Sequence, residues 1–214
     1  MTYVASPSTR FAPVATLEGR VREQFTAILC RSFPPNEHES VESIDQRLAG
    51  GARLYGAFSG EDLVGFALML ALDVEGVYLL DYLAVADTHR NQGLGHAFLD
   101  HLRAEYGSIE GAAGILLEVE SDQWGTEEER YLRARRVAFY RRNGAVSLPL
   151  SRHLEMPAMD DSGCIYTKLM WLPLSATIPT GGTLRRCLVS FLWHCYGLGE
   201  ETALAKAALA ALPE

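Results

Sequence analysis

The segment from Asp81 to Leu99 most constrains the fold, because an apolar strand there runs into a turn with two glycines and restarts as an amphipathic helix. Gly93 and Gly95 carry no Cβ, so the backbone can curl and approach a ligand closely. The first free N–H groups of the helix, with the helix dipole behind them, favour an anion. The segment therefore predicts a phosphate-binding turn, although a tight strand-to-helix connection without a ligand has the same spacing.

The same segment carries a family resemblance. From LLDYLAV through Arg90-x-x-Gly93-x-Gly95 into AFLDHL, it resembles the central motif of the GNAT superfamily of N-acetyltransferases, which bind acetyl-CoA. The dinucleotide fingerprint is excluded, because no third glycine follows at the required spacing. The resemblance covers roughly residues 16 to 173. It implies an α/β fold with a GNAT-like mixed, mostly antiparallel sheet flanked by helices.

Composition narrows the class of protein. A chain of 214 residues that is 48% hydrophobic and 21% charged can bury a sizeable core. A net charge of −8 argues against general nucleic-acid binding, and the apolar runs are too short to span a bilayer, so we expect no membrane partner and a cytoplasmic location. Four scattered cysteines without C-x-x-C pairs predict buried free thiols and no metal site: Cys30, Cys164, Cys187 and Cys195.

Hydrophobic periodicity predicts alternating helices and strands. We expect helices over 16–31, 37–48, 93–106 and 127–142, and strands over 53–58, 63–73, 77–85, 115–120, 145–150 and 164–171. We divide the chain into a GNAT-like domain over 1–173 and a linker with a C-terminal helical extension over 174–214. The extension packs on its own domain, covers the substrate cleft or forms a homodimer contact, and we favour the first.

The resemblance also implies a cofactor site. It places the pyrophosphate of acetyl-CoA over the backbone of Arg90 to His96, which includes Asn91, with the Arg90 side chain and the N–H groups of Gly93, Leu94 and Gly95 as ligands. The other interpretation of Arg90 is an ion pair with a surface carboxylate.

Upstream of this loop, the sequence Leu83-Ala84-Val85 matches the family strand whose end splays from its neighbour. In the family, this end exposes backbone groups to the pantetheine arm and an N–H group, here that of Val85, to the thioester oxygen. An ordinary paired strand end is the alternative.

Tyr140 is the candidate general acid. It lies in VAFYRRNG, which is similar to the second family signature, a helix with a tyrosine four residues before a glycine. In the family the hydroxyl commonly lies near the sulfur, and a positioned donor can protonate the leaving thiolate. A tyrosine beside Phe139 also fits an ordinary core position.

Three carboxylates are candidates for the base. Asp81 shares a strand face with Leu83 and Val85, and Glu118 and Glu120 share one face of a later strand. Each can accept the proton of the amine through water, orient a cationic substrate or pair with an arginine. Many relatives also work without a single essential base.

The leading interpretation is therefore an N-acetyltransferase in which a primary amine attacks acetyl-CoA directly. The acceptor is a small-molecule amine or a peptide amine, and the acidic candidates favour a small cationic amine. The alternative is a non-catalytic acyl-CoA-binding or regulatory module, whose acceptor site is closed by the C-terminal helices.

Overall fold

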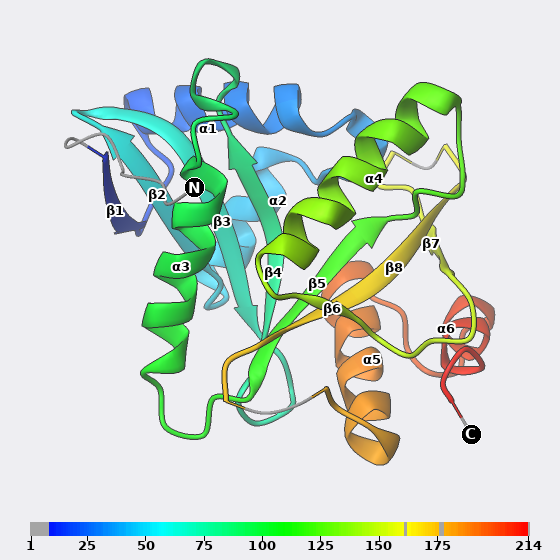
Figure 1. The fold of residues 1–214 in the computed structure, drawn as a ribbon. Helices are drawn as coiled ribbons and strands as arrows, with labels where there is room; N and C mark the ends of the chain where they lie inside the picture. Colours follow the sequence, from blue (N-terminus) through cyan, green and yellow to red (C-terminus); the bar gives the residue numbers. More distant parts are fainter. Residues whose placement is uncertain (1–8, 161, 176–177, 214) are drawn as a thin grey trace. The chain divides into compact units, whose positions relative to one another are not determined.

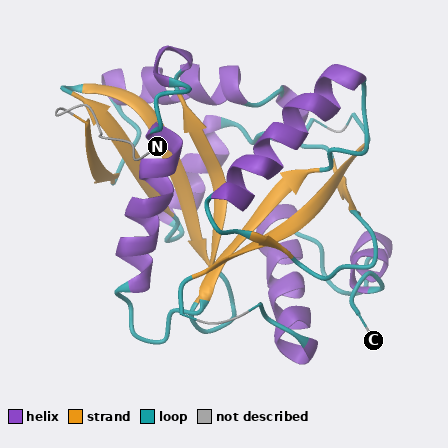
Figure 2. Cartoon of the chain, in the orientation of Figure 1, coloured by secondary structure: helices purple, strands orange, loops and turns teal. Residues whose placement is uncertain are grey.

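A computed structural model describes residues 9–160, 162–175 and 178–213 (Figure 1). The chain forms two compact units. The first comprises Met1–Leu70, Leu80–Glu105 and Met159–Ser162, and the second comprises Ala71–Leu79, Tyr106–Ala158 and Gly163–Glu214. Mostly antiparallel strands flanked by helices build both units, so the predicted α/β class is confirmed (Figure 2).

The first unit contains most of the N-terminal elements. They are β1 (Thr9–Val14), α1 (Gly19–Ser32), η1 (Pro35–Glu37), α2 (Val41–Ala49), β2 (Arg53–Ser59), β3 (Asp62–Ala71), β4 (Val77–Val85), η2 (Asp87–His89) and α3 (Leu94–Gly107), of which β3, β4 and α3 continue into the second unit by a few residues. β2 pairs antiparallel with β1 and with β3. Sequence analysis missed β1, an edge strand that tolerates Pro13 because its outer side needs no ladder hydrogen bond.

Helices α1 and α2 bury their apolar faces against the strands of this unit. Phe25 of α1 and Phe66 of β3 are fully buried, with ring centroids 4.3 Å apart. α2 begins at Val41, later than predicted, because the Ser40 side chain accepts a hydrogen bond from the Ser43 N–H group and caps the helix there.

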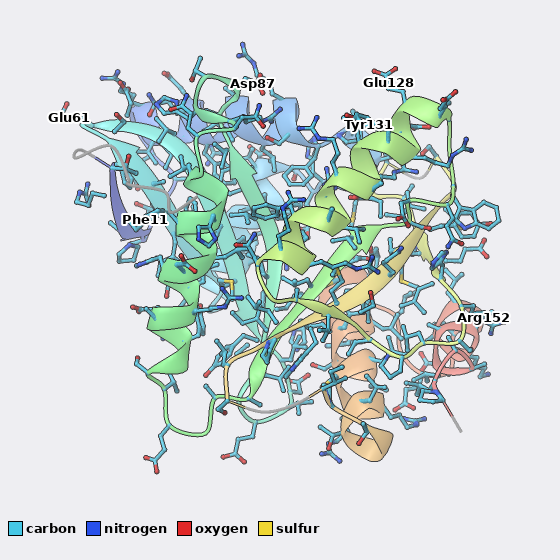
Figure 3. All side chains as sticks on the ribbon, viewed as in Figure 1. Phe11, Glu61, Asp87, Glu128, Tyr131 and Arg152 are labelled. Carbon is cyan, nitrogen blue, oxygen red and sulfur yellow. The ribbon has the colours of Figure 1, made fainter. Side chains whose placement is uncertain are left out.

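Helix α3 is fixed to β1 by aromatic contacts of Phe11, the residue of β1 that Figure 3 labels. The Phe11 ring lies 4.8 Å from that of the fully buried Phe98, edge to face, and stacks on His101 at 5.0 Å. These contacts hold the helix whose N-terminus the sequence assigns to phosphate binding.

The second unit contains the remaining elements. They are β5 (Gly114–Glu120), α4 (Glu127–Arg142), β6 (Val146–Ser147), β7 (Leu154–Pro157), β8 (Cys164–Pro173), α5 (Gly181–Tyr196) and α6 (Ala203–Leu209). β8 pairs antiparallel with β5, β6 and β7. The predicted strand over 145–150 is shorter than expected, since Pro149 has no N–H group to donate, and the four-residue β7 was missed.

The C-terminal helix α5 packs within the second unit, as we favoured. Ser190 accepts a hydrogen bond from the Asp73 N–H group at 2.8 Å, and His194 Nε2 lies 2.9 Å from Asp73 Oδ2. The division at residue 173 stays a prediction, and residues 1–8, 176 and 177 of the predicted domain and linker lie outside the described part of the chain.

Two further properties bear on the sequence predictions. All four cysteines are free, but Cys30 and Cys164 are exposed, so the prediction of buried thiols is wrong for these two, which lie on the outer side of α1 and at the start of β8. None of the described helices is long and apolar enough to cross a membrane.

Candidate active site

The loop between β4 and α3 has the backbone that an anion site needs. Asn91 has a φ of 59° and Gly93 a φ of 82°, and the chain turns sharply between them into α3. The Ala97 N–H group donates to the Gly93 carbonyl at 3.0 Å, so Leu94, Gly95 and His96 form the first turn of the helix. The N–H groups of a first turn have no acceptor within the helix and can donate to a ligand.

The Arg90 side chain is held within the first unit. Its Nε donates to the Val85 carbonyl at 2.9 Å, its Nη2 donates to Ser32 Oγ at 2.9 Å, and its Nη1 lies 2.7 Å from Asp87 Oδ1. Figure 3 marks Asp87 on this loop. The guanidinium group therefore braces the loop against α1 and β4, in the ion-paired arrangement that the sequence left open.

The end of β4 offers one backbone donor away from β3. The Ala86 N–H group donates to the Val64 carbonyl of β3 at 2.9 Å. Because successive N–H groups of a strand point to opposite edges, the Val85 N–H group points away from β3. Tyr82 and Ala84 are buried, whereas Asp81, Leu83 and Val85 are half-buried, which agrees with the predicted shared face.

Asp81 lies in a cluster with Arg47 of α2 and Glu39, which precedes α2. Arg47 Nη1 is 2.8 Å from Asp81 Oδ2 and also pairs with Glu39 Oε1. Burial raises the pKa of Asp81 to about 6, an effect that Arg47 opposes and Glu39 reinforces. A carboxyl group with this pKa is mostly ionised at neutral pH and can still accept a proton.

Tyr140 lies in α4, in the second unit, and is 8% exposed. Burial raises its pKa to about 12, while Arg136 lowers the pKa and Glu120 raises it. The hydroxyl therefore keeps its proton across the physiological range, as a proton donor must. Glu120 itself pairs with Arg136, which is the structural alternative that the sequence left open for this carboxylate.

Glu118 of β5 has a partner that sequence analysis missed. The Tyr196 hydroxyl, at the end of α5, lies 2.9 Å from both carboxylate oxygens of Glu118. No sequence signal places the end of α5 at this position of β5, because the contact depends on how the helix packs rather than on local spacing.

A second polar pair in this unit was also missed. Ser121 is fully buried, and its Oγ lies 3.0 Å from His153 Nδ1, while the adjacent Asp122 pairs with Lys168 at 2.5 Å. Burial lowers the pKa of His153, so its ring is neutral at neutral pH. His153 lies beside the missed strand β7, which explains why spacing did not reveal the pair.

The predicted site residues thus fall into two groups. Asp81, Leu83, Val85 and the loop from Arg90 to His96 belong to the first unit, and Tyr140, Glu118 and Glu120 belong to the second.

Comparison with known proteins identifies a domain within the chain. Residues 50–144, which include the loop and Tyr140, match the family model described as an acetyltransferase (GNAT) domain. The chain therefore contains a GNAT acetyltransferase domain over these residues, as the resemblance implied. The comparison with curated proteins found no match.

Solved structures of the family share the fold. A GNAT-family acetyltransferase from Bacteroides thetaiotaomicron aligns with a TM-score of 0.68 at 23% identity, over 88% of this chain and 99% of its own. The ribosomal-protein-S18-alanine N-acetyltransferase from Escherichia coli aligns with a TM-score of 0.58 at 22% identity, over 79% and 96%. A GNAT-family acetyltransferase from Elizabethkingia anophelis with acetyl-CoA bound aligns with a TM-score of 0.57 at 16% identity, over 79% and 100%.

Proposed function

We propose that the protein transfers the acetyl group of acetyl-CoA to a primary amine by direct attack of the amine on the thioester. The observation that carries this proposal is the loop from Arg90 to His96, where the positive φ of Gly93 leads into the first turn of α3 within the segment that matches the family model. Acetyl-CoA as donor is supported by the related structure from Elizabethkingia anophelis, whose title states that it contains acetyl-CoA.

The donor is held through the backbone. The N–H groups of Gly93, Leu94 and Gly95 bind the pyrophosphate, and the Arg90 side chain exchanges Asp87 for a phosphate oxygen. Leu83 and Val85 offer backbone groups to the pantetheine arm. The Val85 N–H group, which points away from β3, donates to the thioester oxygen as negative charge develops there.

Three proton transfers complete the reaction. Asp81 takes a proton from the acceptor ammonium, and the neutral amine forms a bond from nitrogen to the carbonyl carbon. The carbon–sulfur bond then breaks, and Tyr140 protonates the leaving thiolate. The proton that the nitrogen still carries then passes to the Tyr140 oxygen, which leaves a neutral amide and restores the Tyr140 hydroxyl. The pKa of Asp81, about 6, suits the first transfer, and the protonated state of Tyr140 suits the second.

Cationic amines are the acceptor class that we favour. In the first unit, Glu39 and Asp81 both pair with Arg47. In the second unit, the Glu118 carboxylate accepts a hydrogen bond from the Tyr196 hydroxyl. Each set of proposed site residues therefore includes acidic side chains. In this proposal Asp81 accepts the proton of the cationic acceptor.

Calorimetry with acetyl-CoA, followed by free CoA release against a panel of small amines and peptides in the same preparation, tests the proposal. We expect binding and release with at least one cationic amine. Binding without release for every amine would favour the acyl-CoA-binding module, with Tyr196 closing access to Glu118. Absence of binding would contradict the assignment of the loop.

A further inference from the structure

Two carboxylates share one guanidinium group in the first unit. Arg47 Nη1 contacts Asp81 Oδ2 at 2.8 Å and pairs with Glu39 Oε1, and the three side chains are only 13–16% exposed. Glu39 is fixed independently of Arg47, because its carboxylate accepts a hydrogen bond from the Ser43 hydroxyl and its N–H group donates to the Tyr82 hydroxyl at 3.2 Å. The position of Glu39 beside Arg47 is therefore fixed by these two hydrogen bonds as well as by the ion pair.

This arrangement changes the cost of protonating Asp81. A mostly buried arginine that loses a counter-ion is left with an uncompensated charge, which is strongly destabilising. When Asp81 takes up a proton, Glu39 still holds Arg47, so the guanidinium group keeps a negative partner. When Asp81 loses the proton, Arg47 stabilises the carboxylate again.

We propose that Glu39 is a positioning residue that retains Arg47 while Asp81 exchanges a proton with the acceptor amine. An N–H bond of the ammonium breaks, an O–H bond forms on Asp81, and Asp81 later returns the proton to water. Arg47 and Glu39 keep their own protonation states throughout. The inference rests on the proposed function, in which Asp81 is the base.

The charges that act on Asp81 in this unit come from few groups. Arg47 faces it from α2, Glu39 from the segment before α2, and Tyr82 follows it on β4. Burial raises the pKa of Tyr82 well above its usual range, so its hydroxyl stays neutral. Arg47 and Glu39 are therefore the groups whose removal should move the titration of Asp81, and in opposite directions.

The test is the titration of the Asp81 carboxyl group, followed by ¹³C NMR in the free protein and assigned with Asp81→Asn. Glu39→Gln should lower the midpoint by about one pH unit, and Arg47→Gln should raise it by at least about one. Arg47→Lys retains the positive charge, so the midpoint of Asp81 in this variant should lie close to that of the native protein. The matched control is Glu42→Gln on α2, whose carboxylate is 74% exposed and pairs with Arg22, and it should leave the midpoint unchanged.

Activity gives the second measurement. In the pH profile of kcat/KM, the acid limb should move to lower pH in Glu39→Gln and to higher pH in Arg47→Gln. Glu39→Gln should also lower the plateau of kcat/KM about tenfold, because Asp81 becomes a weaker base. Midpoints that do not move, or that move in the same direction in both variants, would overturn the inference. Absence of turnover with every amine would instead overturn the proposed function, while the NMR midpoints would still decide whether Glu39 and Arg47 control Asp81.

Discussion

The loop from Arg90 to His96, which we propose to bind the pyrophosphate, and the Glu39–Arg47–Asp81 cluster lie in the same compact unit but are built in different ways. The loop uses backbone N–H groups from one short stretch of chain, oriented by the positive φ of Gly93 and the start of α3. The cluster uses side chains from β4, α2 and the segment before α2. Backbone donors bind a fixed charge in one geometry, whereas a shared guanidinium group can follow a change of charge. We therefore expect the loop to control affinity and the cluster to control rate and pH dependence.

Asp81→Asn should have the largest effect. We expect kcat/KM at alkaline pH to fall about 1,000-fold, within the range of a lost general base, with acetyl-CoA affinity unchanged. In the native protein, kcat/KM should fall as the pH decreases through about 6, because Asp81 becomes protonated, and the variant should lose this limb. Asp45→Asn on α2, where Asp45 pairs with Arg22, is the control. An unchanged acid limb in Asp81→Asn would show that another group is the base.

Gly93→Leu should impair acetyl-CoA binding by the loop from Arg90 to His96. A side chain at the φ of 82° strains the turn and covers the donors, and losing two charge-assisted hydrogen bonds weakens acetyl-CoA binding about 100-fold in calorimetry. Gly60→Leu is the matched control, since Gly60 has a φ of 63° and open space around it, and it tests the backbone strain alone. Equal affinity in both variants would contradict the loop assignment.

Tyr140→Phe extends the comparison to the second unit. We expect kcat to fall about 100-fold, at the lower end of the range for a lost proton donor, with little change in acetyl-CoA affinity. Because burial raises the pKa of Tyr140 to about 12, ionisation of Tyr140 should produce no alkaline limb in the accessible pH range. Tyr131→Phe, on the exposed side of the same helix, is the control (Figure 3). An unchanged kcat in Tyr140→Phe would show that the tyrosine is an ordinary core residue.

The contrast between local and long-range structure also explains which parts of the fold the sequence could predict. The strand over Val77–Val85 and the helix over Glu127–Arg142 have the predicted bounds, because periodicity and capping residues are local signals. α4 even carries a complete capping box formed by Thr126 and Glu129. Edge and short strands were missed, since Pro13 in β1 and four residues in β7 give little periodicity.

The partners of the candidate carboxylates could not be predicted in this way. Asp81 and Glu118 were predicted as candidates from their strand positions, but Arg47 and Tyr196 reach them from distant parts of the chain. Helical spacing indicates which face of a helix is buried and does not indicate which strand residue the face contacts. The roles of the predicted site residues stay predictions until such variants are measured.

The smallest expected effect concerns Arg90, the one side chain that the proposal adds to the backbone site. In the structure its guanidinium group pairs with Asp87, so binding a phosphate exchanges one ion pair for another, and Arg90→Gln should weaken acetyl-CoA binding only about fivefold. Asp87→Asn should strengthen binding about twofold, because it releases Arg90 and removes a negative charge beside the phosphate. If Arg90 acts through this exchange, Asp87→Asn should have no benefit once Arg90 is Gln. A benefit of the same size in both backgrounds would mean that Asp87 repels the phosphate independently and that Arg90 only braces the loop.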